Sequence, residues 1–194
     1  CDAVKDAALN PSWKKGRVMI LTESKMTEMK KGKEYGSLSA IFMQQAKEVL
    51  PLISSTPVEA IFPSGDTDTR YLQARFGLAA SDLVQISSSF ISFAAEILRY
   101  IENHWCMIVE DIEKGTINSE IRMPDDVRER LMTKIIPMPE RAAELRAIFE
   151  EGFDKPFATR VWKHLQLVSG VGTGAFEIYE KKIKERYVDE RVQF

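Results

Sequence analysis

The sequence contains only two cysteines, Cys1 and Cys106, in 194 residues. Two cysteines are too few for a disulfide framework, so we expect a cytoplasmic protein, kept in a reducing compartment. No stretch reaches the roughly 18 consecutive apolar residues that cross a membrane. Charge of one sign is also lacking, because 27 basic and 29 acidic residues give a net charge of −2. These absences argue against secreted, membrane-embedded and nucleic-acid-binding proteins.

The most basic segment, 14–33, carries seven Lys or Arg residues against two Glu, and only Tyr35 lies near it for base stacking. We therefore expect a solvated loop there, and neither a nucleic acid nor a membrane as partner. Hydrophobic residues make up 44% of the chain and charged residues 29%, the balance of a soluble globular protein. This length and composition predict a single domain over residues 1–194.

Short apolar runs alternate with segments of helical period. The runs that indicate strands are 17–22, 58–63, 83–86 and 165–168, and helical patterns cover 2–9, 37–50, 71–78 and 90–112. Pro51 is expected to end the helix at 37–50, a polar loop is expected over Glu23–Gly36, and Asp66, Thr67 and Asp68 offer N-cap side chains. Helices opened by Pro124 and Pro139 predict a helical excursion at about 115–160. This order predicts an α/β fold with a mostly parallel sheet flanked by helices, and the run at 165–168 as its central strand.

The helix predicted at 90–112 carries an apolar stripe that should face a core. His104 and Cys106 are two residues apart and point to different faces, so they are poor candidates to share a metal ion. The acidic residues near its end are interpreted as a solvated face; they are Glu110, Asp111 and Glu113. Ser87, Ser88 and Ser89 invite a nucleophile hypothesis, but no flanking glycines form a nucleophile elbow and no histidine is near in sequence.

Three glycines separate the apolar run at 165–168 from a segment of helical period at 176–183; they are Gly170, Gly172 and Gly174. Strand-to-helix turns at the carboxyl edge of an α/β sheet bind phosphorylated or adenylylated ligands, because free backbone N–H groups and the helix N-terminus favour negative charge. Thr173 adds a hydroxyl to this turn. The alternative is that the glycines only let the chain bend tightly against its neighbours.

Several patches carry a resemblance to a known family. The central patch is WCMIVEDIEKGTINSEI, with Trp105, Asp111-Ile112, Gly115-Thr116 and Ser119, followed by Pro124. Two more are Thr22-Glu23-Ser24-Lys25 after the first strand, and Gly172–Phe176 with Tyr179. In order and spacing, these patches resemble the auxin-responsive Gretchen Hagen family of acyl acid–amido synthetases, and the chain resembles the middle of that family's large N-terminal domain.

The resemblance implies an adenylate-forming ligase. Such an enzyme uses ATP and Mg²⁺ to activate a carboxylic acid as an acyl-adenylate, and then transfers the acyl group to an amine or amino acid. The resemblance implies that Gly172, Thr173, Gly174, Ala175 and Phe176 contact the nucleotide and acyl-adenylate, and that Ser37 and Leu38 line the acyl pocket. Because this chemistry depends on positioning and charge stabilisation, no catalytic acid or base and no metal ligand is assigned to the chain.

Parts of the family pattern are not found in this sequence. A phosphate loop should precede residue 1, while a motif ending in a magnesium-binding Glu, a ribose-binding Asp and a mobile carboxy-terminal domain should follow Phe194. The chain begins with Cys1 and an amphipathic stretch instead of Met. We therefore expect an internal fragment of a longer enzyme that makes no acyl-adenylate alone and has the remainder of its parent chain as a partner.

A dinucleotide-binding oxidoreductase is one alternative. Gly170, Gly172 and Ala175 satisfy the pattern G-x-G-x-x-G/A, and Glu190 stands 20 residues after Gly170, near the place of a ribose-binding acid. Against this, the turn comes late in the chain, and Glu190 precedes the strand that RVQF would have to form.

A non-catalytic helical interaction module is the other alternative. It would use the apolar stripe at 90–112 against a partner, although such stripes are more often internal core. An interaction module should be monomeric and indifferent to ligands, whereas an excised enzyme core should expose apolar surface.

Overall fold

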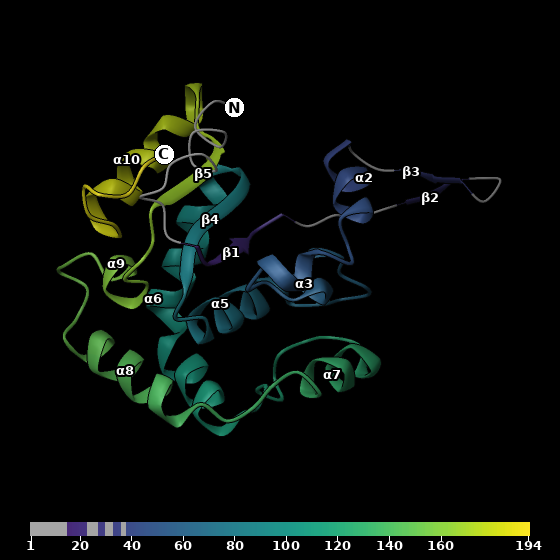
Figure 1. The fold of residues 1–194 in the computed structure, drawn as a ribbon, viewed down its shortest axis with the longest axis horizontal. Coiled ribbons are helices and arrows are strands. Elements are labelled where there is room, and N and C mark those ends of the chain that lie inside the picture. Colours follow the sequence, from purple (N-terminus) through teal and green to yellow (C-terminus); the bar gives the residue numbers. More distant parts are fainter. Residues whose placement is uncertain (1–14, 23–26, 30–32, 36–37) are drawn as a thin grey trace.

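The computed structural model describes residues 15–22, 27–29, 33–35 and 38–194. Three parallel strands form the main sheet in the order β1–β4–β5 (Figure 1); they are β1 (Arg17–Ile20), β4 (Leu83–Phe90) and β5 (Leu167–Val171). This parallel sheet with flanking helices confirms the predicted α/β class. Among the described residues the central strand is β4, so the prediction that the run at 165–168 is central was wrong. There, β5 pairs with β4 on one side and forms only an isolated bridge, to Gln193, on the other.

The side chains of β1 and the residue after it alternate between two apolar clusters, as the two-residue period of a strand requires. Met19 and Leu21 belong to the main core. Ile20 belongs to a second, smaller core with Leu50 and Ile61. The sheet is therefore covered on both faces at β1.

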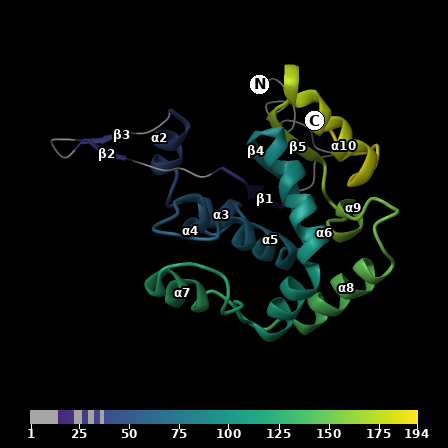
Figure 2. The same ribbon diagram turned by 180° about the vertical axis from the view of Figure 1, so that it is seen from behind.

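Helices α5 (Thr69–Ala79) and α6 (Ile91–Lys114) pack against each other and against the sheet (Figure 2). The predicted N-cap of α5 is confirmed at Asp68, whose Oδ1 accepts a hydrogen bond of 3.2 Å from the backbone N–H of Tyr71. Helix α6 begins at the residue after β4 ends, so no loop separates strand from helix. Most of the predicted stripe is buried, including Ile97, Ile101 and Ile108.

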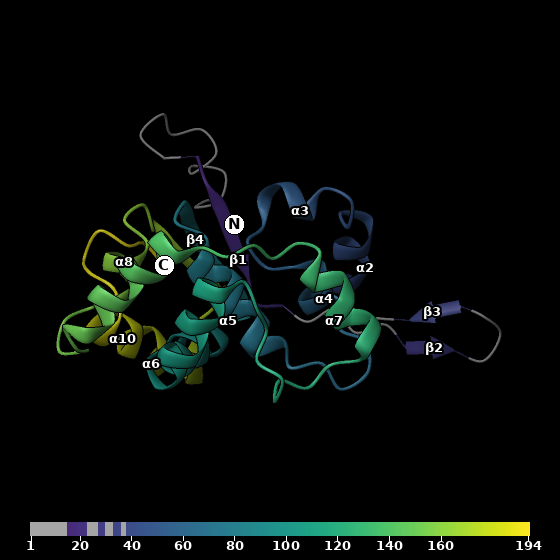
Figure 3. The same ribbon diagram turned by 90° about the horizontal axis from the view of Figure 1, so that it is seen from below.

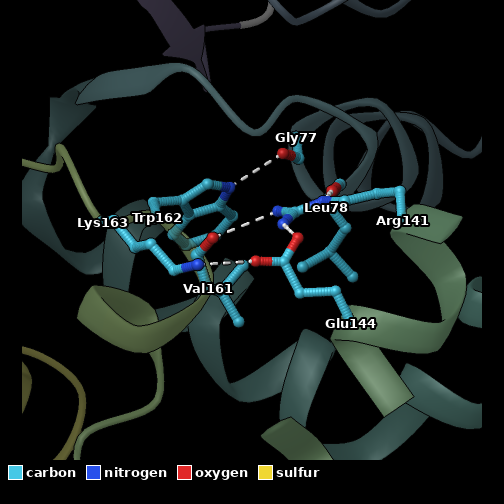
Figure 4. Close-up of polar contacts among 7 residues, drawn as sticks. All are labelled: Gly77, Leu78, Arg141, Glu144, Val161, Trp162 and Lys163. Carbon is cyan, nitrogen blue, oxygen red and sulfur yellow. Dashed lines mark hydrogen bonds and ion pairs between the residues drawn. The ribbon is translucent and has the colours of Figure 1, made fainter. Parts of the chain in front are cut away.

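The predicted helical excursion is confirmed as α7 (Asp125–Met132), α8 (Pro139–Glu150) and α9 (Ala158–Val161). Side chains from α8 and from the end of α9 bind the last backbone carbonyls of α5 (Figure 4). The Trp162 indole N–H donates to the Gly77 carbonyl at 2.9 Å, and the Arg141 Nε–H donates to the Leu78 carbonyl at 2.9 Å. Because the last carbonyls of a helix have no acceptor role inside it, these donors satisfy groups that burial would leave unpaired.

Arg141 is itself held by a second set of contacts around the same junction (Figure 4). It donates to the Val161 carbonyl at 3.1 Å and pairs with Glu144 at 2.5 Å, and Lys163 pairs with the other oxygen of Glu144 at 3.0 Å. Arg141 is 7% exposed. These contacts fix α8 and α9 against α5.

The segment before α5 differs from the prediction in three ways. Part of the expected loop at Glu23–Gly36 forms an antiparallel hairpin, β2 (Thr27–Met29) and β3 (Lys33–Tyr35), which projects from the body of the fold (Figure 3). The helix expected at 37–50 stops earlier, as α2 (Leu38–Gln45), and Pro51 lies in the first turn of α3 (Leu50–Ile53), where proline is tolerated. The run at 58–63 is not a strand but contains α4 (Val58–Ile61), which begins after Pro57.

Asp111 was wrongly assigned to a solvated face, since it is 6% exposed. Its carboxylate accepts hydrogen bonds from the Tyr71 hydroxyl at 2.6 Å, the Thr116 hydroxyl at 2.8 Å and the Asn118 backbone N–H at 3.1 Å. Arg75 donates to the backbone carbonyls of Asp111 and Thr116 in the same network. Burial, together with the bond to Asp111, raises the pKa of Tyr71 far above its ordinary value. The network ties the end of α6 and the turn after it to α5.

Candidate functional site

The carboxyl ends of β1, β4 and β5 meet at one edge of the sheet, because the three strands are parallel. In open α/β sheets, this edge is where ligands bind. Thr22 follows β1, Ser89 and Phe90 end β4, and the glycine turn follows β5. The sequence therefore brings four of its conspicuous polar and aromatic features to one place.

The serine run lies at an irregularity in β4. Ser87 pairs with Ser169 but Phe90 pairs with Val171, so β4 carries one more residue than β5 over this interval. Such β-bulges redirect side chains. The Ser88 hydroxyl donates to the Ser169 carbonyl at 3.0 Å, whereas the Ser89 hydroxyl lies 3.1 Å from that of Thr22. Both hydroxyls are thus engaged, one with the neighbouring strand β5 and the other with Thr22 after β1.

Three phenylalanines connect the glycine turn to the end of β4. The Phe90 ring stacks on Phe176 with centroids 5.1 Å apart, and Phe93 meets Phe90 edge-on at 6.0 Å. Phe90 and Phe93 are each 41% exposed. Large aromatic side chains left this accessible at a sheet edge form a surface on which a flat apolar ligand can stack.

A cavity of about 850 Å³ lies beside these aromatic residues. Its floor and walls come from the carboxyl ends of β1 and β4 and from the N-terminal halves of α5 and α6. Lining residues include Leu21, Thr22, Gln73, Ser89, Phe90, Phe93, Ile97 and Tyr100. The volume falls within the range of small-molecule pockets, about 300–1,000 Å³. The cavity therefore has the size and the mixed apolar and polar lining of a ligand site.

Three of the four charged residues that line the cavity are held in ion pairs, and the fourth, Asp68, caps α5. Arg70 and Glu96 form an ion pair at 3.3 Å, and Arg122 pairs with Asp66 at 2.7 Å. Burial, and to a lesser extent the charge of Asp68, raises the pKa of Tyr100 to about 12, so its hydroxyl stays protonated at neutral pH. The lining thus presents neutral polar groups and aromatic rings, with compensated charges at the rim.

The three glycines of the turn serve different purposes. A Cβ at Gly170 would lie 2.7 Å from the Ser88 hydroxyl and 2.9 Å from the Ile91 backbone nitrogen, so here the glycine allows close packing against β4. Gly174 has φ +65° with open space around it, so its requirement is conformational. Gly172 has its nearest neighbour at 3.4 Å, an ordinary distance. The packing interpretation therefore holds for Gly170 and does not account for Gly172 or Gly174.

The turn continues into a short 3₁₀ segment, η1 (Gly174–Phe176), and then α10 (Glu177–Arg186). Thr173 occupies the N-cap position of η1, but its side chain makes no capping hydrogen bond. No side chain therefore caps the start of this helical segment. The Glu180 carboxylate lies close to Gly172, where it opposes an anion, and Lys184 compensates part of that charge at 2.5 Å.

The structure separates the predicted site residues into two groups. Gly172, Thr173, Gly174, Ala175 and Phe176 lie at the carboxyl edge of the sheet, and Phe176 contacts the aromatic wall of the cavity through Phe90. Ser37 lies outside the described residues, and so does the side chain of Leu38, the first residue of α2. Across the described ranges no group of three or more His, Cys, Asp or Glu side chains could hold a metal ion.

Sequence reasoning missed the cavity beside the glycine turn. Phe90 and Phe93 could be assigned only to a helical stripe, because nothing local shows that β4 runs directly into α6. Nothing in the sequence indicates that Gln73 lines a cavity, since a single glutamine in a helix most often lies on the surface. Thr22 and Ser89 were noted separately, and only the parallel pairing of β1 with β4 brings their hydroxyls together.

Comparisons with known proteins give the family of this chain. The model of the GH3 family N-terminal domain matches residues 2–192. Indole-3-acetic acid-amido synthetase GH3.8 of Oryza sativa subsp. indica is 28% identical over 126 residues, 64% of this chain and 21% of that protein. Indole-3-acetic acid-amido synthetase GH3.5 of Arabidopsis thaliana is 27% identical over 126 residues, with 64% and 20% covered. The chain thus spans about a fifth of the length of these relatives.

Solved structures show the same fold. AtGH3.15 acyl acid amido synthetase in complex with 2,4-DB superposes with a TM-score of 0.74 at 18% identity, over 91% of this chain and 31% of that one. Within the described residues, no helix combines the length and apolar character needed to span a membrane. Because the family model covers nearly the whole sequence, the chain belongs to the GH3 family, matching its N-terminal domain.

Proposed function

We propose that this chain forms the acid- and adenylate-binding part of an ATP-dependent acyl acid–amido synthetase. The observation that carries the proposal is the cavity at the carboxyl edge of the sheet, joined to the glycine turn by the stack of Phe90 on Phe176. The proposal is supported by the closeness of this cavity to a strand-to-helix turn of the kind that binds phosphate. An enzyme that joins a carboxylic acid to a nucleotide needs these two sites side by side.

The cavity is proposed to hold the acid. Its aromatic residues favour a flat apolar body over an extended charged one. Relatives are named for indole-3-acetic acid, and a solved relative binds 2,4-DB. We therefore propose an aromatic carboxylic acid as the substrate class, with its ring system in the cavity and its carboxylate toward Phe176.

The glycine turn is proposed to hold the nucleotide phosphates. Its support is the start of η1, which no side chain caps, and the left-handed Gly174. Turns of this kind present backbone N–H groups that bind anions. Without a metal-ligating cluster in the described residues, no step is assigned through Mg²⁺.

The chemistry proposed for this site is one in-line displacement followed by one acyl transfer. A carboxylate oxygen of the acid forms a bond to the α-phosphorus of ATP, and the bond to pyrophosphate breaks. The amine of an amino acid then attacks the acyl carbon, and AMP leaves. The residues of this chain contribute by orienting the acid and by keeping water from its ring, since neither step needs a side-chain nucleophile.

The proposal predicts acid-dependent exchange of pyrophosphate into ATP by the full-length parent enzyme. The most direct variant is Gly174→Ala, because a Cβ residue held at φ +65° is strained by about 1–2 kcal/mol. We expect exchange to fall several-fold in Gly174→Ala. Gly174→Asn serves as the matched control, since asparagine tolerates the left-handed conformation, and it should retain more activity.

Two results would count against the proposal. One is a parent enzyme that shows no exchange with any aromatic acid. The other is Gly174→Ala and Gly174→Val variants that fold normally and turn over like the wild type, which would remove the turn from the site. Residues 1–194 alone are expected to show no exchange.

A further inference from the structure

Gln73 is a buried polar residue of the cavity whose side chain has no hydrogen-bond partner among the described residues. It lies on α5, is 6% exposed, and lines the cavity together with Leu21 and Ile97. Within the described residues its side-chain amide makes no hydrogen bond. Among the described residues, Glu59 Oε2 is the only side-chain polar atom that is both fully buried and without a hydrogen bond. The amide atoms of Gln73 are therefore not fully buried and keep access to the cavity.

An amide in this position carries a donor and an acceptor that need a partner. Removing an amide from water without a hydrogen bond is unfavourable, so such groups in proteins are normally satisfied. A ligand in the cavity is the partner that the geometry offers to Gln73.

The remaining polar groups around the cavity are mostly engaged already. The Thr22 and Ser89 hydroxyls bond each other, Asp68 caps α5, and the two arginines at the rim are ion-paired. Tyr100 is the other lining group without a partner among the described residues, and its hydroxyl is neutral. A charged ligand group placed beside Gln73 would therefore lose water without gaining a counterion.

The position of Gln73 also indicates which end of the ligand it meets. In the proposed function the carboxylate lies toward Phe176, which stacks on Phe90 at the end of β4. Gln73 comes instead from α5, which packs beside β1. The group that reaches Gln73 is thus at the end of the acid away from its carboxylate.

We propose that Gln73 is a specificity-determining residue that hydrogen-bonds a neutral polar substituent, such as a hydroxyl or a ring N–H, on the far end of an aromatic acid. This inference rests on the proposed function for the identity of the ligand. The cavity would then prefer ring-substituted acids with such a group over apolar acids of the same shape.

The test measures acid binding to the full-length parent enzyme by calorimetry, without ATP. The probes are two matched pairs: 4-hydroxyphenylacetate with 4-methylphenylacetate, and 6-hydroxy-2-naphthoate with 6-methyl-2-naphthoate. The wild type should bind the hydroxyl member of at least one pair about tenfold more tightly, as one hydrogen bond to a buried group allows. Gln73→Leu should lose that preference, and Gln45→Leu, an exposed glutamine on α2, should keep it.

The melting temperature of the ligand-free enzyme gives a second measurement. Gln73→Leu should melt at the same temperature as the wild type or higher, because the amide makes no hydrogen bond to the described residues that the substitution could break. A lower melting temperature would show a structural partner for Gln73 and overturn the proposal. Equal hydroxyl preference in wild type and Gln73→Leu, or binding of none of the four acids, would also overturn it. Since binding is measured without ATP, a failure of adenylation alone would leave this result intact.

Discussion

Asp111→Ala should be one of the most destabilising single substitutions in this chain. The change removes a buried carboxylate that accepts three hydrogen bonds, from the Tyr71 hydroxyl, the Thr116 hydroxyl and the Asn118 backbone N–H. It therefore leaves three donors without their acceptor at the junction of α5, α6 and the turn at Gly115.

The magnitude follows from how well water can replace the lost acceptor. The Tyr71 hydroxyl is deeply buried, and leaving it unsatisfied costs about 1–3 kcal/mol. Thr116 and Asn118 are half-buried and line a surface pocket of about 300 Å³, so water can reach them and each loss is about 0.5–1.5 kcal/mol. The sum is about 2–6 kcal/mol. Its middle value of about 4 kcal/mol lowers the melting temperature by roughly 8–16 °C for a chain of this size.

The assay is urea unfolding of residues 1–194, followed by circular dichroism, with thermal melts as a second measure. Glu110→Ala is the matched control, because this exposed carboxylate on the same helix pairs only with Lys114. The control should change the unfolding midpoint little. If Asp111→Ala unfolds at the same urea concentration as Glu110→Ala, the network does not contribute as argued.

Three further outcomes are expected. Burial raises the pKa of Tyr71, so the stability that Tyr71 contributes is complete below its unfolded pKa near 10 and is lost as pH rises above that value. Between pH 10 and 11, the free energy of unfolding of Tyr71→Phe should therefore decline less than that of the wild type. Parallel declines would contradict this. Trp162→Phe removes the hydrogen bond to the Gly77 carbonyl and leaves a space in the core, so the free energy of unfolding in urea should fall by about 2–4 kcal/mol. A fall of less than about 1 kcal/mol would refute the capping role of Trp162. Glu180→Gln removes a carboxylate beside Gly172 and should lower the KM for ATP in the parent enzyme, while a higher KM would place the phosphates elsewhere.

The sequence predicts the fold where local patterns and tertiary environment agree. The strand at 17–20, the Asp68 cap and the long helix from Ile91 have strong periodicity or capping chemistry, and all three are present. The run at 58–63 shows the limit of this reasoning. Its apolar residues fit a strand or a single buried helical turn equally well, and only packing into the second core selects the helix.

The candidate site was predicted in part. The glycine turn could be located because glycines between a strand and a helix are a local signal. The cavity could not, since it depends on β1 lying beside β4 and on α5 and α6 packing across them. For a related reason, the burial of Asp111 was not predicted. In the sequence it stands between the acidic residues Glu110 and Glu113, and nothing local distinguishes the carboxylate that faces α5.

The direct join of β4 to α6 has a mechanical consequence. With no loop at Phe90, α6 acts as a rigid rod, and Phe93 at one end is separated from Asp111 at the other by ~27 Å of helix. The rod is fastened at both ends: β4 holds the first, and the bond from Tyr71 to Asp111 holds the second against α5. Because α5 and α6 form walls of the cavity, we expect the width available to a ligand to depend in part on this contact, which lies far outside the cavity.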